Sequence, residues 1–217
     1  MKKVLTFLLV VLSWGFVAAQ DTSETPSYEK RVFQMDEDEM PYAILLPENY
    51  DASKSYPLVL FLHGAGERGS DNERQLIHGA SLFRAQSFRE KYPAIILIPQ
   101  CGSGDYWSNV KKGVAQGGGP DFSFYKKGSP TKAMLLLEGL LDEVLQNYSL
   151  DKNRLYVGGL SMGGMGTFEL VKRNPKLFAA AFPICGGASP RAIRKYKRPS
   201  WWVFHGNADP VVPADFS

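Results

Sequence analysis

The chain has 217 residues and a formal net charge of +3, which falls to +1 if residues 1–19, with their two lysines, are removed. Such an even balance gives no electrostatic case for binding nucleic acid or an anionic membrane surface. The remaining 217 − 19 = 198 residues suffice for one domain with a sizeable core.

The N-terminal segment is typical of a secretory signal. Lys2 and Lys3 precede a mostly apolar run that ends in the small residues Ala18 and Ala19, which signal peptidase prefers. The run is shorter than the ~20 residues needed to span a bilayer. We therefore expect residues 1–19 to be a signal peptide and residues 20–28 a polar leader. The mature protein would be secreted or periplasmic, without stable membrane association.

Short apolar segments after residue 28 predict the strands of a sheet. They lie at residues 31–35, 42–46, 57–62, 94–98, 154–158, 179–184 and 201–204. The first two flank an acidic turn and should form a hairpin at one sheet edge. The third and fourth are continuously apolar, which is typical of parallel strands buried on both faces.

Helical patterns separate these strands. The clearest covers residues 131–148, where Ser129 supplies an N-cap and Pro130 a first-turn proline. Strands that alternate with helices predict an α/β fold with a doubly wound, mostly parallel sheet. Residues 29–217 are expected to form this single domain.

Residues 101–128 are rich in glycine and aromatic side chains. They follow the carboxyl end of a predicted strand, where open α/β sheets bind ligands. Our hypothesis is a loop that faces substrate, with Trp107 as a substrate-binding residue. An ordinary surface excursion is the alternative.

The most informative motif is Gly159-Leu160-Ser161-Met162-Gly163, between a predicted strand and a helical pattern. This G-x-S-x-G pattern predicts a nucleophile elbow, in which small neighbours let the chain turn sharply and expose the serine. A serine nucleophile also needs donors for the oxyanion, an acid and a base. We expect the backbone N–H groups of Met162 and Ala65 to be the donors.

The expected acid is Asp209, in a turn after the last predicted strand, although an ordinary turn aspartate is an alternative. His63, beside the expected donor Ala65, is interpreted as a structural residue at a strand end.

Three motifs in this order resemble those of secreted α/β-hydrolase esterases. They are the elbow, His63-Gly64-Ala65-Gly66-Glu67-Arg68-Gly69, and His205-Gly206-Asn207-Ala208-Asp209-Pro210-Val211-Val212-Pro213. The resemblance is to the polyhydroxybutyrate-depolymerase and feruloyl-esterase type and to related prolyl-oligopeptidase-like hydrolases. It implies a sheet ordered 1-2-4-3-5-6-7 and a ping-pong acyl-enzyme mechanism on Ser161, with Asp209 as acid. It also implies no metal, no organic cofactor, and a small-molecule or polysaccharide-linked ester as substrate.

The implied strand order bears on Cys101 and Cys185. Each follows a predicted strand, and these strands would be three positions apart, or roughly 14 Å. A disulfide needs Cα atoms within about 7 Å. We therefore expect two unpaired thiols.

The sequence departs from the resemblance at the base. In these enzymes the catalytic histidine follows the acid, but His63, His78 and His205 all precede Asp209. We expect a serine carboxylic-ester hydrolase whose given sequence is truncated at the C-terminus, without the last strand and helix of the fold. A serine peptidase of the same fold and a non-catalytic ligand-binding protein are the alternatives.

Overall fold

The computed structural model describes residues 26–115, 118–125, 128–189 and 198–217. The expected signal peptide, residues 1–19, lies outside the described residues. Among those described, no helix is long and apolar enough to cross a membrane.

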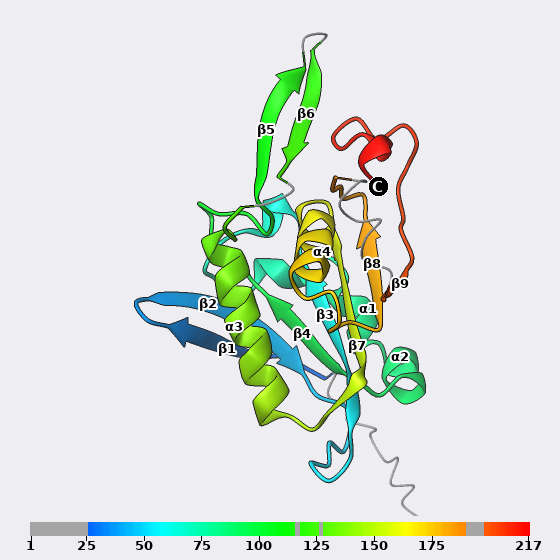
Figure 1. Cartoon of the computed structure of the whole chain (residues 1–217). Coiled ribbons are helices and arrows are strands. Elements are labelled where there is room, and N and C mark those ends of the chain that lie inside the picture. The colour runs from blue at the N-terminus through cyan, green and yellow to red at the C-terminus, as the bar shows by residue number, and fades with distance from the viewer. Residues whose placement is uncertain (1–25, 116–117, 126–127, 190–197) are drawn as a thin grey trace, which may run out of the picture.

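A seven-stranded sheet forms the centre of the molecule (Figure 1). Its strands are β1 (Glu29–Met35), β2 (Asp38–Leu45), β3 (Tyr56–Leu62), β4 (Ile95–Pro99), β7 (Leu150–Leu160), β8 (Ala180–Ile184) and β9 (Ser200–Trp201). They lie in the order β1-β2-β4-β3-β7-β8-β9, with β2 antiparallel to both its neighbours and the others parallel. Counted along the chain within this sheet, the order is 1-2-4-3-5-6-7, as expected from the resemblance.

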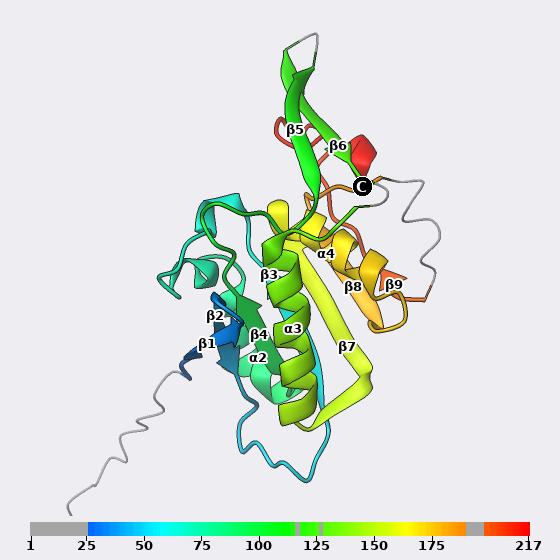
Figure 2. The ribbon, with the colours of Figure 1, turned by 60° about the vertical axis from the view of Figure 1, so that its left-hand side comes forward.

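Helices cover both faces of the sheet (Figures 1 and 2). α3 (Lys132–Asn147) and α4 (Met162–Arg173) pack on one face, and α1 (Ala80–Arg84) and α2 (Gln86–Lys91) lie on the other. Within β3, Leu58 and Leu60 belong to the first core and Val59 and Phe61 to the second. Burial on both faces explains why this strand is apolar at every position from 57 to 62, and it confirms the predicted α/β class.

The start of α3 differs from the expectation. Its N-cap is Thr131, whose hydroxyl accepts a hydrogen bond from the N–H of Met134 at 3.1 Å. The prediction of Ser129 as the cap was wrong, because the helix begins two residues later and Pro130 precedes the cap.

Residues 101–128 contain a hairpin that the sequence did not predict. β5 (Val110–Ala115) and β6 (Gly119–Phe124) form a separate antiparallel two-stranded sheet that projects from one end of the molecule (Figure 2). Phe122 at its base packs with Met165 of α4. The hairpin therefore rises beside the N-terminal part of α4.

Cys101 and Cys185 are both free, which confirms the expectation of unpaired thiols. Cys101 follows β4 and Cys185 follows β8, with β3 and β7 between these two strands.

Candidate active site

Ser161 occupies the turn between β7 and α4. Its backbone has φ 54° and ψ −114°, a conformation that is costly for a residue with a Cβ and that concentrates at functional sites. Its N–H donates to the carbonyl of Ile184 at 2.8 Å, and its carbonyl accepts from the N–H of Met165 at 3.0 Å. Neighbouring strand and helix thus hold the turn, which leaves Ser161 partly exposed.

The two glycines of the motif allow the end of β3 to approach the turn. An ideal Cβ at Gly159 would lie 2.5 Å from the carbonyl oxygen of Leu62 and 2.6 Å from that of Gly163. At Gly163 a Cβ would lie 1.9 Å from the same Leu62 oxygen. Only glycine fits at either position, and this contact brings the loop after β3 against the serine turn.

That loop contains the first expected oxyanion donor. Ala65 begins a 3-10 turn, η1 (Ala65–Glu67), and Met162 is the first residue of α4. The first N–H groups of a helix have no acceptor within it and favour negative charge. Leu62 of β3 is paired with Gly159 of β7, so the two N–H groups follow neighbouring strand ends. The topology is therefore compatible with a shared oxyanion site.

His63 is a fixed structural residue in this loop. It is fully buried, and its Nδ1 lies 2.6 Å from the carbonyl oxygen of Gly64. Its Nε2 accepts a hydrogen bond from the N–H of Cys101 at 2.9 Å, which assigns the proton to Nδ1. Burial lowers the pKa of His63 to about 4. The neutral ring, with both nitrogens hydrogen-bonded, joins the loop after β3 to the segment after β4. This agrees with the interpretation of His63 as a structural residue.

Trp107 also joins these two segments, and the prediction that it contacts substrate is wrong. The side chain is completely buried, and its indole N–H donates to the carbonyl of His63 at 3.1 Å. Its ring meets the His63 ring edge-on, with centroids 5.3 Å apart. It packs beneath Gly166 of α4, where an ideal Cβ would lie 2.5 Å from the Trp107 Cβ. The ring thus supports the loop and helix and presents no surface to a ligand.

Asp209 lies in a turn that fixes its carboxylate. One oxygen accepts the N–H groups of Val211 at 2.8 Å and Val212 at 3.0 Å, and the other lies 3.3 Å from Nε2 of His205. The backbone donors, Val212 first, and then His205 hold the pKa of Asp209 below its usual value. Val212 is buried in a cluster with Met165 of α4. The carboxylate is therefore ionised at neutral pH and lies in a turn packed beside the helix that begins at the serine.

None of the three histidines of the sequence is hydrogen-bonded to the Ser161 hydroxyl. His205 is held in the Asp209 turn, where Nδ1 contacts the Ser217 hydroxyl and Nε2 lies 2.8 Å from the carbonyl of Val212. His78 lies 3.6 Å from a carboxylate oxygen of Glu67. His205 was not expected to contact the acid, although its position four residues before Asp209 in a turn is a signal that could have suggested it.

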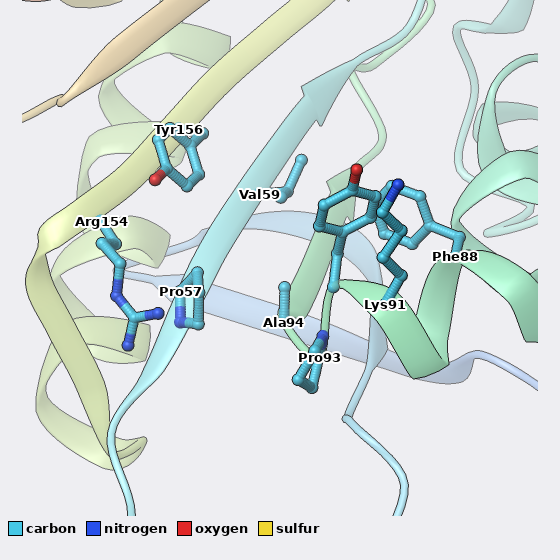
Figure 3. A pocket seen from close by; sticks show the side chains of 9 residues that line it. Pro57, Val59, Phe88, Lys91, Pro93, Ala94, Arg154 and Tyr156 are labelled. Carbon is cyan, nitrogen blue, oxygen red and sulfur yellow. The ribbon is translucent and has the colours of Figure 1, made fainter.

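Two cavities differ in their relation to the serine. One, of about 440 Å³, lies between the sheet and α2 (Figure 3). It is lined by Pro57, Val59, Phe88, Lys91, Tyr92, Pro93, Ala94, Arg154 and Tyr156. Tyr156, the lining residue of β7 that lies nearest to the serine, precedes Ser161 by five residues of extended strand, which at about 3.3 Å per residue is roughly 16 Å. This cavity is therefore too far away to hold a group bonded to Ser161.

A smaller cleft lies along α4. Met165, one helical turn after Ser161, lines it together with Phe124 and Ser108 at the base of the hairpin. The Ser108 hydroxyl is buried and has no hydrogen-bond partner among the described residues. Nowhere in the described ranges do three or more His, Cys, Asp or Glu residues cluster as a metal site.

A doubly wound sheet with a strained serine between strand and helix defines an α/β-hydrolase-type fold. A family model, "Esterase: Putative esterase", matches residues 34–212, and the chain belongs to this family. The chain is 24% identical over 176 residues to "Probable feruloyl esterase C" of Aspergillus oryzae, a match that covers 80% of this chain and 56% of that protein. It is 29% identical over 134 residues to "Poly(3-hydroxyalkanoate) depolymerase C" of Paucimonas lemoignei, covering 60% of this chain and 28% of that protein.

A solved structure agrees with these relatives. The crystal structure of a thermostable esterase superimposes with a TM-score of 0.75 and 35% identity, covering 88% of this chain and 49% of that one. The resemblance to feruloyl esterases and polyhydroxybutyrate depolymerases is thereby confirmed. The chain spans about half the length of the feruloyl esterases it matches.

Proposed function

We propose that this protein is a serine carboxylic-ester hydrolase that acts through an acyl-enzyme on Ser161. The observation that carries this proposal is the backbone of Ser161, whose positive φ is stabilised by neighbouring elements and leaves the side chain partly exposed. Strain of this kind is retained where the position of one side chain matters. A purely structural Gly-Ser turn would not require it.

The proposed reaction has two halves. The Ser161 oxygen attacks the ester carbonyl, its proton passes to a base, and the alcohol leaves with a proton from that base. Water then attacks the acyl-serine, which releases the carboxylic acid and restores the hydroxyl. The N–H groups of Ala65 and Met162 are proposed to bind the oxyanion in both halves, and Asp209 to orient the base and stabilise its charged form.

We propose that His205 does not serve as the base. Leu160 is paired with Ile184, and Ile184 with Phe204, so Ser161 and His205 follow strand positions two strands apart. At about 4.8 Å per strand, their backbones are roughly 10 Å apart. Both nitrogens of His205 are already in contact with the Asp209 turn. We therefore expect these 217 residues alone to hydrolyse esters slowly, and an added base to accelerate the reaction.

For the substrate, we propose a small-molecule or polysaccharide-linked ester. The feruloyl esterase name of the Aspergillus relative supports an aromatic acyl group. We also propose that the protein is secreted or periplasmic, from the pattern of residues 1–19.

Hydrolysis of p-nitrophenyl acetate in the presence of imidazole tests the proposal. The Ser161→Ala variant supplies the rate of imidazole alone, and we expect the wild-type protein to exceed it several-fold. His205→Ala should keep this excess, because His205 is not expected to be the base. Equal rates for the wild type and Ser161→Ala would overturn the proposal, whereas loss of activity in His205→Ala would identify His205 as the base.

The same assay separates the alternatives. Methyl ferulate and a peptide p-nitroanilide, offered in parallel, distinguish an esterase from a peptidase. Ligand binding without Ser161-dependent turnover on either substrate would favour a non-catalytic protein.

A further inference from the structure

Gln100 is a buried amide directly after β4, and its side chain bonds to the loop that follows β3. Only 1% of the residue is exposed. Its Nε2 donates to the carbonyl of Glu67 at 3.2 Å and to a carboxylate oxygen of Asp71 at 2.9 Å. Its Oε1 accepts the N–H of Asn72 at 2.7 Å. One side chain thus joins three residues within six positions of the loop.

The same loop includes the proposed oxyanion donor Ala65. Of the residues bonded to Gln100, Glu67 ends η1 and the other two follow it, whereas His63 and Gly64 lie before η1. Further bonds come from the segment after Gln100, since the N–H of Gly69 donates to the carbonyl of Cys101 at 2.9 Å. Gln100 therefore holds the residues at and after the end of η1, which the hydrogen bonds of the His63 ring do not reach.

The chemistry at this position specifically requires an amide. Asp71 also accepts the N–H groups of Glu73 at 2.9 Å and Arg74 at 3.0 Å. These bonds, with that of Gln100, lower the pKa of Asp71 to about 2, so Asp71 is a charged acceptor at neutral pH. The carbonyl of Glu67 is also an acceptor, whereas the N–H of Asn72 is a donor. Only a side chain with both an N–H₂ group and a carbonyl oxygen satisfies all three partners.

We propose that Gln100 is a positioning residue for catalysis, which holds the loop of residues 64–72 so that the Ala65 N–H is aligned with the oxyanion formed at Ser161. This inference rests on the proposed esterase function, because the role of Ala65 belongs to it. Gln100 acts through the loop and does not touch substrate. Removal of its amide leaves the carbonyl of Glu67 and the N–H of Asn72 without a protein partner in a partly buried site, and we expect the loop to shift as they find other partners.

Two variants test the proposal in the imidazole-supported assay. Gln100→Leu removes all three bonds at similar volume, and Gln100→Glu keeps the acceptor for Asn72 but places a carboxylate against Asp71. Because oxyanion bonds strengthen in the transition state, we expect kcat to fall about 10- to 100-fold in both variants while KM changes less than about twofold. Melting temperatures, measured alongside, show whether each variant is folded at the assay temperature.

Gln75→Leu is the matched control. Gln75 is equally buried, and its Nε2 donates to the Asn72 side chain at 2.5 Å, but no bond joins it to Glu67 or Asp71. We expect this variant to keep kcat within about twofold, even if it melts at a lower temperature. Unchanged kcat in both Gln100 variants, or an equal loss in Gln75→Leu, would overturn the positioning role.

Hydrogen exchange gives a readout that needs no turnover. The amides of residues 64–72 should exchange faster in Gln100→Leu than in the wild type or Gln75→Leu. If wild-type protein shows no Ser161-dependent hydrolysis, the esterase proposal fails, and so does the catalytic role of Gln100 that rests on it. Faster exchange with unchanged kcat in an active enzyme would instead overturn the positioning role alone.

Discussion

Gly163 of the serine turn lies against the end of β3, so that a Cβ on it would be 1.9 Å from the carbonyl oxygen of Leu62 and 2.8 Å from that of His63. Both obstacles are backbone atoms, which cannot rotate away. The contact joins the Ser161 turn to the loop of the proposed oxyanion donor. Strain at this one glycine must therefore affect both parts of the site.

The Gly163→Ala variant should accordingly be destabilised. Alanine usually stabilises a helix by about 1 kcal/mol relative to glycine, but here we expect a loss of about 3 kcal/mol from the backbone clash. Urea denaturation measures the difference. Gly66→Ala is the control, since nothing lies within 4 Å of a Cβ there, and its stability should stay within about 0.5 kcal/mol of the wild type. Equal stability of the two variants would contradict the close contact.

The buried His63 predicts a pH dependence of folding. Burial lowers its pKa from 6.5 to about 4, so between these values the unfolded chain binds a proton that the folded protein does not. Stability is therefore full above pH 6.5 and falls as the pH drops toward 4, by up to about 3 kcal/mol. The low pKa of Asp71 also stabilises the folded protein at neutral pH. This contribution is lost only as the pH falls below about 3.8, outside this window.

The measurement is the free energy of unfolding at pH 7 and pH 4.5. His63→Gln should be less stable at pH 7 but should lose less on acidification than the wild type. An identical loss in both proteins would show that His63 is not the group responsible.

The two thiols should differ in reactivity. Burial, and then Asp105, raise the pKa of Cys101 to about 12, so its thiol is protonated and inaccessible, whereas Cys185 is partly exposed. Ellman's reagent should find one fast thiol in the native protein and two after denaturation. Cys185→Ser should remove the fast thiol. No thiol in denatured, unreduced protein would reveal a disulfide and contradict the structure.

The sequence predicted those features that depend on neighbouring residues. The apolar runs of β3 and β4 and the glycines around Ser161 carry their structural reason within a few positions, and the strand order followed from the resemblance. Trp107 was misplaced because its burial depends on His63 and Gly166, which are 44 and 59 positions away. An aromatic residue in a glycine-rich segment does not reveal such partners.

The role of Gln100 could not be read from the sequence for the same reason. Its partners lie 28 to 33 positions earlier, and only the parallel pairing of β3 with β4 brings them together. A single polar residue directly after a wholly apolar strand was the one available signal. The β5–β6 hairpin was missed because its strands contain lysine, glycine and proline and neither has a continuous apolar run like those of the predicted strands.

The central claim is that Ser161 is a nucleophile, and covalent labelling tests it most directly. The protein is incubated with a fluorophosphonate probe and imidazole, and its intact mass and peptide masses are then measured. The account predicts one probe adduct per chain, located on Ser161, and none in Ser161→Ala. Absence of an adduct in the wild type, or equal labelling of Ser161→Ala, would contradict it.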